Sequence, residues 1–248
     1  MMRTPIWTTA STAKAYIGGH RGASAVAPEN TAAAYEAAIA AGADFIETDL
    51  RLTRNGVAVA FHDNSLQRLC GDARAVEQLD FEELKVLHPA IMRMADAIDL
   101  IGDRASILLD TKITDLTDLE RAAGMLGSRL VSGRAAFGVR SLAALGVIKT
   151  ALPNCPALGL FNDIGEYPQL AEQGGDWARL WQSDVSVAAI NGLRERGLKV
   201  IIMAGLPETV GQIEADALQT LLDMQPDAIM LNDPQLAVRL QKAAAAQA

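Results

Sequence analysis

Cysteine and aromatic residues are scarce in this chain of 248 residues. The first shortage limits the metal sites and disulfides that the protein can form, and the second limits the composition of its core. Its two cysteines, Cys70 and Cys155, lack the paired spacing of a zinc site built from cysteines, so such a site is excluded. One disulfide between them is possible, but two reduced and inert thiols are the favoured interpretation. Only 4% of the residues are aromatic while 50% are hydrophobic, so we expect a core of Ala, Leu, Ile and Val.

The sequence also lacks an excess of positive charge and a long apolar run. With 22 Lys and Arg against 30 Asp and Glu, its formal net charge is −8. This charge excludes a general nucleic-acid binder and disfavours adsorption on anionic membranes. No run of about 18 apolar residues appears, and residues 1–16 hold no apolar stretch of signal-peptide length. We therefore expect a cytoplasmic protein with no integral membrane segment and no nucleic-acid partner.

Histidine is scarce as well, and its placement is informative. His20 and His62 both lie within residues 18–63, whereas His88 precedes Pro89 outside that segment. Histidine exchanges protons near neutral pH, so residues 18–63 are the first place to look for acid and base chemistry. His88 is expected to be an ordinary packed or surface residue.

Strand-like and helix-like segments alternate along the chain. Eight strands are expected, at residues 16–19, 44–49, 107–111, 136–140, 157–161, 178–182, 199–204 and 228–232. Helices are expected between them, at residues 31–41, 116–126, 142–152, 187–196, 208–224 and 235–245. Asn30, Asp115 and Ser141 are expected to cap the first three of these helices, and Gly42 and Gly197 lie where helices should stop.

This alternation favours parallel pairing, and eight units predict an α/β fold, a closed (β/α)8 TIM barrel. An open, doubly wound sheet is the alternative. No linker divides the chain, so we expect one domain over residues 1–248. Residues 65–89 are the least regular and are expected to form a small insertion at the rim of the barrel.

A tight turn is predicted at Asn55-Gly56, between two runs that suit strands. This dipeptide favours a two-residue type I′ hairpin loop, which would place Asp49 opposite His62. Glu47 would share a face with Asp49, because side chains alternate along a strand. The hairpin would thereby fold His62 onto two acids. A surface hairpin with ordinary charges is the alternative.

Candidate catalytic groups follow three predicted strands. His20 follows the first strand, Glu47 and Asp49 end the second, and Asp110 and Lys112 end the third. Active groups of TIM barrels lie at the carboxyl ends of the strands. These five residues are therefore expected to converge on one rim.

The three acids would offer hard oxygen ligands, which suit one divalent cation, Mg²⁺ or Ca²⁺. Without a cation, three gathered carboxylates would repel one another. The alternative is a set of caps and salt bridges in which Lys112 is simply paired with Asp110. The sequence leaves the choice between the two metals open.

His20 and His62 form a natural acid and base pair for cleaving a phosphodiester. One would take a proton from the attacking oxygen, and the other would donate a proton to the leaving alkoxide. Arg21 and Lys112 could neutralise the phosphate as charge builds on its oxygens. A structural ion pair with Glu29 is the alternative for Arg21.

These residues lie in motifs that resemble the glycerophosphodiester phosphodiesterase family, whose members are TIM barrels. The matching motifs are His20-Arg21-Gly22, Pro28-Glu29-Asn30-Thr31, Glu47-x-Asp49, Asn55-Gly56 and His62-Asp63 followed by Leu66 and Arg68. Two further segments, Asp110-Thr111-Lys112 and Leu231-Asn232-Asp233-Pro234, are similar in outline.

The resemblance implies a metal-dependent enzyme that splits a small-molecule glycerophosphodiester into glycerol 3-phosphate and an alcohol. It implies roles for seven residues: general acid and base for His20 and His62, ligands of the divalent cation for Glu47, Asp49 and Asp110, and phosphate binding for Arg21 and Lys112. The oligomeric state stays open.

Three departures from the family pattern bear on the substrate. Asp110 is one methylene shorter than the usual Glu, so the third ligand is expected to bind through water or to shift the metal. Residues 203–205 replace a Trp-Thr-Val-Asn element, so an aromatic wall and a polar contact to the substrate are expected to be missing, and residues 69–72 lack a Thr- and Gly-rich run. The alcohol therefore stays open. Two alternatives are a lyase that releases a cyclic phosphate or acts on a lysophospholipid, and a non-catalytic barrel that binds phosphate.

Overall fold

The structure is a computed structural model that describes residues 4–10, 12, 14–130 and 133–247. Eight parallel strands close into a barrel, because β1 pairs with β2 on one side and with β9 on the other. The bounds are β1 Tyr16–Gly19, β2 Phe45–Leu52, β4 Ser106–Thr111, β5 Ala135–Val139, β6 Ala157–Gly159, β7 Trp177–Trp181, β8 Lys199–Met203 and β9 Ala228–Leu231, with the antiparallel β3 at Ala58–Ala60. The predicted TIM barrel is confirmed, and the open sheet is wrong.

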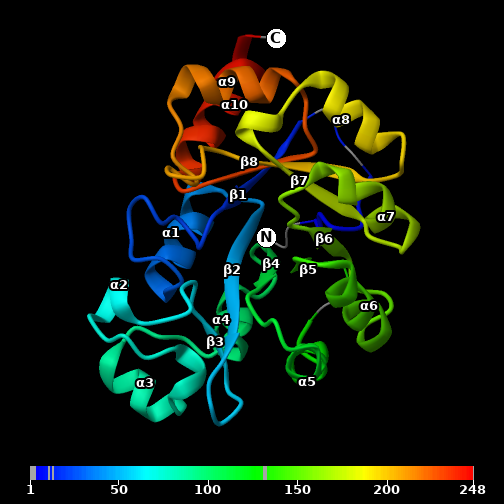
Figure 1. The fold of residues 1–248 in the computed structure, drawn as a ribbon. Helices are drawn as coiled ribbons and strands as arrows, with labels where there is room; N and C mark the ends of the chain where they lie inside the picture. Colours follow the sequence, from blue (N-terminus) through cyan, green and yellow to red (C-terminus); the bar gives the residue numbers. More distant parts are fainter. Residues whose placement is uncertain (1–3, 11, 13, 131–132, 248) are drawn as a thin grey trace.

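Helices surround this barrel on its outer side (Figure 1). The α-helices are α1 Ala32–Ala41, α2 Gln67–Cys70, α3 Phe81–Leu87, α4 Met94–Ile101, α5 Leu116–Gly127, α6 Leu142–Ala151, α7 Tyr167–Glu172, α8 Val187–Arg194, α9 Ala215–Asp223 and α10 Pro234–Gln247. Short 3₁₀ turns are η1 Val76–Gln78, η2 Ile164–Glu166 and η3 Gln182–Asp184. The predicted caps Asp115 and Ser141 each accept a hydrogen bond from a backbone N–H in the first turn of α5 and α6.

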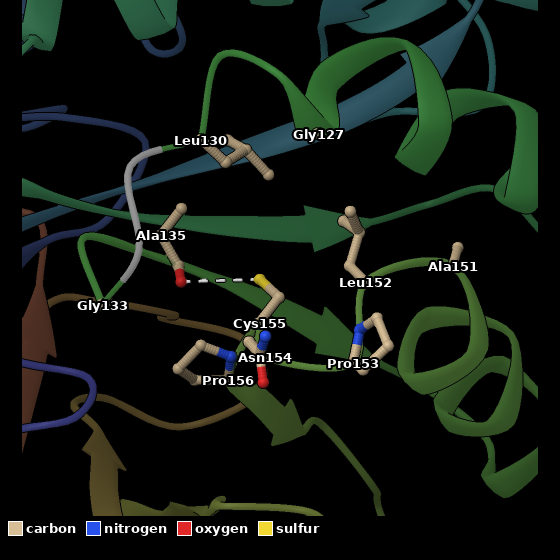
Figure 2. A pocket seen from close by; sticks show the side chains of 10 residues that line it. All are labelled: Gly127, Leu130, Gly133, Ala135, Ala151, Leu152, Pro153, Asn154, Cys155 and Pro156. Carbon is tan, nitrogen blue, oxygen red and sulfur yellow. Dashed lines mark hydrogen bonds between the residues drawn. The ribbon is translucent and has the colours of Figure 1, made fainter.

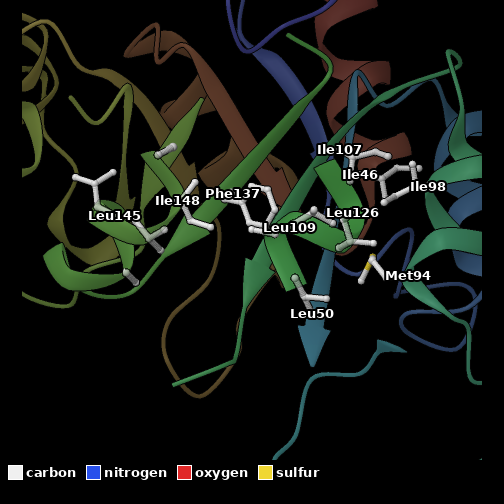
Figure 3. Close-up of a cluster of buried hydrophobic side chains, with 14 of the residues drawn as sticks. Ile46, Leu50, Met94, Ile98, Ile107, Leu109, Leu126, Phe137, Leu145 and Ile148 are labelled. Atoms are coloured by element: carbon white, nitrogen blue, oxygen red, sulfur yellow. The ribbon is translucent and has the colours of Figure 1, made fainter. Parts of the chain in front are cut away.

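Side chains that point outward from the strands form the main apolar core beneath the helices (Figure 3). Ile46 and Leu50 of β2 and Phe137 of β5 are fully buried there. They belong to one cluster with side chains of the surrounding helices, such as Met94 of α4 and Leu145 of α6. Residues two apart share a strand face, so alternate positions supply this layer and the others face the barrel interior.

Side chains that point into the barrel change from apolar at its amino-terminal end to charged at its carboxyl end. In β2 the inward positions are Phe45, Glu47 and Asp49. Trp7 closes the apolar end, where its ring meets those of Phe45 and Trp177 edge-on at centroid distances of 5.2 and 5.3 Å. This buried aromatic layer supports the strands directly below the charged rim.

The β2–β3 hairpin differs from its prediction by one residue of register. Its loop has three residues, 54–56, of which Gly56 takes the left-handed φ of 75°. A three-residue loop with glycine in this position is the next commonest hairpin connection after the two-residue one. Phe61 therefore pairs with Asp49, and its N–H donates to the Asp49 carbonyl at 3.0 Å. His62 lies beyond the end of β3, so the slip does not turn it away from the acids.

The first helix is capped by Thr31 and not, as predicted, by Asn30. The Thr31 hydroxyl accepts a hydrogen bond from the N–H of Ala34. Asn30 adopts a left-handed φ of 57° instead, a conformation that asparagine tolerates better than most residues. This backbone kink frees the Asn30 amide to contact β2.

The helix predicted at residues 208–224 begins only at Ala215. The preceding residues form a loop that is tied to two strand ends: the Gly211 N–H donates to the Ala204 carbonyl at 2.7 Å, and its carbonyl accepts from the Asn232 N–H at 2.8 Å. Gly211 has a φ of 79°, and a Cβ there would lie 2.0 Å from the Asn232 amide oxygen. Contact with the end of β9 thus outweighs helix propensity in this segment.

The irregular segment 65–89 contains α2, η1 and α3, which lie beside the β2–β3 hairpin (Figure 1). Leu66, Val76 and Leu84 form a separate apolar cluster there with Phe61. The segment is thereby fixed on the hairpin that carries His62.

Candidate functional site

Three carboxylates gather at the carboxyl end of the barrel. Glu47, Asp49 and Asp110 each offer an oxygen, and these oxygens all lie within 4.8 Å of one another. All three residues are buried, with Glu47 only 1% exposed. Among the described residues, Glu47 Oε1 has no hydrogen-bond partner. A buried orphan oxygen within a set of hard oxygen donors fits a divalent cation of the Mg²⁺ or Ca²⁺ kind.

Two cations contact the third acid. Lys112 Nζ lies 2.5 Å from Asp110 Oδ2 and 3.0 Å from Asp49 Oδ1. Arg140, at the end of β5, donates to both Asp110 oxygens, at 2.5 and 3.1 Å. The salt bridge proposed as the alternative role of Lys112 therefore exists within the acid cluster. Arg140 was not predicted, although its place at the carboxyl end of an expected strand was a usable signal.

The two acids of β2 differ in their affinity for a proton. Burial, and then the carboxylates of Asp49 and Asp110, raise the pKa of Glu47 well above its ordinary value. Burial acts on Asp49 in the same direction, but Lys112 and Arg21 outweigh it and lower the pKa of Asp49. The site thus combines a firmly ionised carboxylate with one whose charge is poorly neutralised, an imbalance that a bound cation would relieve.

His20 is held in one orientation by the far end of the chain. Its Nδ1 lies 2.8 Å from Oδ1 of Asn232, whose amide nitrogen donates to the Val210 carbonyl at 2.9 Å. Because the amide nitrogen is engaged there, the amide oxygen faces His20 and accepts the Nδ1 hydrogen. The other ring nitrogen, Nε2, lies 4.0 Å from Glu47 Oε2. Burial, followed by the nearby Arg21, lowers the pKa of His20 to about 4, so the ring is neutral at pH 7.

His62 belongs to a network of hydrogen-bonded charged side chains at the edge of the site. Its Nδ1 lies 2.7 Å from Asp63, which accepts from Arg68 Nε at 2.6 Å. Arg68 also donates to Glu29, and Glu29 pairs with Arg21 at 3.0 Å. The alternative proposed for Arg21 is therefore present as a contact. Burial lowers the pKa of His62, while the charges of Asp49 and Asp63 oppose that change.

Asn30 positions Asp49 within the acid cluster. Its amide nitrogen donates to Asp49 Oδ2 at 2.7 Å, and its amide oxygen accepts from the Asp49 N–H and the Thr48 hydroxyl, both at 3.2 Å. The residue is 4% exposed. From the sequence we predicted only a helix-capping role for Asn30, so its contacts with Asp49 and Thr48 were not anticipated.

We expect Asn30→Ala to lower the free energy of unfolding by about 2–4 kcal/mol, because buried hydrogen bonds are lost and alanine is strained at a left-handed φ. Urea denaturation would measure this loss. Asn30→Gly removes the same hydrogen bonds without the strain and should lose less, and Asn154→Ala on the exposed opposite rim should change little. A loss below about 1 kcal/mol for Asn30→Ala would contradict the role.

The predicted site residues share one cavity of about 210 Å³ at the barrel mouth. Six of the seven line it, namely His20, Arg21, Glu47, His62, Asp110 and Lys112, and the seventh, Asp49, contacts Lys112 and Arg21 beside it. Arg179 and Trp181 of β7 also line this cavity, together with Arg140 and apolar side chains. Trp181 supplies an aromatic surface from a neighbouring strand, so the expectation that residues 203–205 leave the site without an aromatic wall is wrong.

A second cavity, of about 220 Å³, lies at the amino-terminal ends of β5 and β6, away from this rim (Figure 2). Its lining is apolar apart from Asn154 and Cys155, and the Cys155 thiol points toward the Ala135 carbonyl. Burial raises the pKa of Cys155 to about 11, so the thiol is protonated at neutral pH. His88 also lies outside the candidate site, where its ring packs edge-on against Phe61.

Comparison with known proteins identifies a family whose model matches most of the chain. Residues 20–236 match the model of the glycerophosphoryl diester phosphodiesterase family. A probable glycerophosphodiester phosphodiesterase 1 of Mycobacterium tuberculosis is 36% identical over 107 residues, which are 43% of this chain and 39% of that protein. A lysophospholipase D of Mus musculus is 47% identical over 68 residues, 27% of this chain and 21% of that protein. The matched segments thus span well under half of these relatives.

The fold has close structural counterparts. A phosphodiesterase of Oleispira antarctica, solved in complex with the product sn-glycerol-3-phosphate, superposes with a TM-score of 0.80 over 92% of this chain and 97% of its own, at 19% identity. Within the described residues, no helix has the length and apolar character needed to cross a membrane. Because the family model covers most of the chain, this protein belongs to the glycerophosphoryl diester phosphodiesterase family.

Proposed function

We propose that this protein hydrolyses glycerophosphodiesters to glycerol 3-phosphate and an alcohol, in a reaction that requires a divalent cation. The observation that carries the proposal is the convergence of two histidines and three carboxylates on one cavity of the barrel mouth. Membership of the family and the product named for the Oleispira antarctica structure support the same chemistry.

His20 suits the role of general base. It is neutral at pH 7, and its Nδ1 hydrogen is committed to Asn232, so Nε2 presents a lone pair to the cavity. In the mechanism we propose, Nε2 accepts the proton of the hydroxyl that attacks phosphorus. In this family that hydroxyl would be the neighbouring one of the glycerol group, and water would then open the resulting cyclic phosphate to give glycerol 3-phosphate.

His62 suits the role of general acid. The Asp63 carboxylate, which accepts the Nδ1 hydrogen, stabilises the protonated ring against the effect of burial, and that ring can give its Nε2 proton to the leaving alkoxide. Its greater exposure, 34% of the side chain against 10% for His20, also places it where the alcohol can depart. The two histidines thereby divide the proton transfers between them.

Glu47, Asp49 and Asp110 would hold the cation, and Arg21 and Lys112 would bind phosphate. A bound divalent cation supplies positive charge that offsets the charge building on the phosphoryl oxygens. Lys112 contacts two of the acids and faces the cavity, so it can shift its hydrogen bonds to a phosphate oxygen. The sequence-based expectation of a cytoplasmic location stays a prediction.

A panel of glycerophosphodiesters assayed for released glycerol 3-phosphate tests the function. We expect release in the presence of Mg²⁺ or Ca²⁺ and its loss in excess EDTA, with recovery when the cation is restored. No release from any member of the panel with either cation would refute the proposed activity.

A second candidate is cleavage of a lysophospholipid with release of a cyclic phosphate. The apolar part of the cavity, which includes Leu160, Met203 and Met230, and the matched segment of the mouse lysophospholipase D favour it. Phosphorus NMR distinguishes the two. A persistent cyclic phosphate formed from a lysophospholipid supports this candidate, and prompt formation of glycerol 3-phosphate from a glycerophosphodiester, with no product from the lysophospholipid, rejects it.

A further inference from the structure

Arg179 is a buried cation in the candidate site that the proposed mechanism does not use. It projects inward from β7 and lines the cavity, and it is only 4% exposed. One terminal nitrogen, Nη2, donates to the Phe161 carbonyl at 2.9 Å and lies 3.5 Å from the Asn162 amide oxygen. The other, Nη1, has no hydrogen-bond partner in the described part of the chain.

The other three Arg and Lys side chains that line the cavity already form ion pairs with acidic side chains. Arg21 pairs with Glu29 at 3.0 Å, and Lys112 and Arg140 each lie 2.5 Å from Asp110. No comparable ion pair joins Arg179 to an acid among the residues that the structure describes. Burial lowers the pKa of Arg179, and the nearby positive charge of Arg140 lowers it further, yet a guanidinium remains charged at neutral pH. A desolvated charge of this kind is costly unless an anion joins it.

The guanidinium is also held in a fixed position. Its carbon lies 3.9 Å from the centre of the Trp181 ring, a stacking distance that favours a cation over an aromatic face. Trp181 and the Phe161 carbonyl therefore fix the direction of Nη1 before any ligand arrives. A preorganised donor loses less freedom on binding than a mobile surface arginine does.

The place of Arg179 in the barrel separates it from the bond that is broken. Around the barrel, β7 lies four strands from β2 in either direction, so Arg179 faces Glu47 and Asp49 from the opposite wall. A phosphorus atom held between His20 and His62 lies near the β1–β2 side. A ligand that reaches Arg179 must therefore extend across the mouth, as the alcohol of a diester does.

Resting on the proposed function, we infer that the preferred substrate is a glycerophosphodiester whose alcohol carries a second anionic group, a carboxylate or a phosphate, and that Arg179 binds this group. Nη1 would donate to it, and Arg140 would add positive charge nearby. The planar guanidinium suits both kinds of anion. Arg179 is in this sense a specificity-determining residue.

Matched substrates test the inference. Glycerophosphoserine differs from glycerophosphoethanolamine by one carboxylate, and glycerophosphoinositol 4-phosphate differs from glycerophosphoinositol by one phosphate. We expect the wild-type protein to prefer at least one anionic member by about tenfold or more in kcat/KM, the scale of a charged hydrogen bond. Arg179→Gln and Arg179→Lys should lower that ratio, to near one for Gln, whatever their absolute rates. Arg129→Gln, at an exposed pair with Asp99, is the matched control and should keep the ratio.

The pair that shows the preference identifies the anion as carboxylate or phosphate. Hydrolysis without any preference, or a preference that Arg179→Gln leaves intact, overturns the inference while the proposed function stands. Calorimetry can measure the binding of the same substrate pairs to His20→Ala protein, with and without Arg179→Gln. This measurement tests the inference in the absence of turnover. Equal affinity for both members of each pair overturns the inference even if no substrate is hydrolysed.

Discussion

His20→Ala is expected to lower kcat by about 10²–10⁴-fold, and His62→Ala by a similar factor, because each removes one of two proton transfers to or from the reacting oxygens. Steady-state release of glycerol 3-phosphate measures both. Circular dichroism and thermal unfolding would show whether each variant keeps its fold. His88→Ala is the matched control, since His88 packs against Phe61 outside the cavity and its loss should leave kcat within about threefold.

The two histidine variants can be told apart with an activated leaving group. When the alcohol is replaced by p-nitrophenol, the departing oxygen needs little help from an acid. His62→Ala should then recover most of its lost rate, whereas His20→Ala should remain slow because the attacking hydroxyl still needs a base. Recovery of His20→Ala instead would reverse the assignment, and near-normal turnover of either variant on the natural ester would remove that histidine from the mechanism.

Glu47→Gln should make the metal-free protein more stable at neutral pH and at the same time weaken its binding of the cation. Glu47 has a raised pKa, so between its ordinary and its raised value the folded state binds more protons than the unfolded state. Stability contributed by the protonated group is therefore present at low pH and lost as the pH rises through that window. Gln cannot ionise, so in EDTA at pH 7–8 we expect a gain of about 1–3 kcal/mol over the wild type.

Added cation should stabilise the wild type more than it stabilises Glu47→Gln. At about 100 times its dissociation constant, a bound ion stabilises the folded wild type by about 2.7 kcal/mol, which is roughly 5–10 °C in Tm for a chain of this size. Glu47→Gln should gain much less, with an affinity for the cation at least about tenfold weaker. Glu36→Gln, which breaks an exposed pair with Arg104, is the control and should respond to the cation as the wild type does. An equal shift in Glu47→Gln would show that Glu47 is not a ligand.

Several features of the site could be predicted from local patterns. The two-residue period of strands places Glu47 and Asp49 on one face, and the barrel rule places them with His20 and Asp110 at the same rim. These inferences needed only the order of strands and helices. They held although the hairpin register shifted by one residue, because His62 lies past the last paired residue of β3.

Other features depended on local conformations between which the sequence alone does not discriminate. Asn55-Gly56 suits both a two-residue and a three-residue loop, and packing of the hairpin against segment 65–89 accompanies the longer one. Asn30 and Thr31 are both good helix caps, and only the proximity of Asp49 shows why Thr31 takes the cap while Asn30 turns toward the acids.

The sequence by itself determined the barrel, the rim and the kinds of group that meet there, because strand periodicity and chain order are local properties that survive small errors in register. Only the tertiary structure decided which polar and charged side chains of the site pair with one another. Asn232 reaches His20, 212 residues away, because β1 pairs with β9, and Arg140 reaches Asp110 from the neighbouring strand. Arg179 faces the acids across the barrel with no acid bonded to it in the described chain. Such pairings follow from how the sheet closes, which no local pattern encodes.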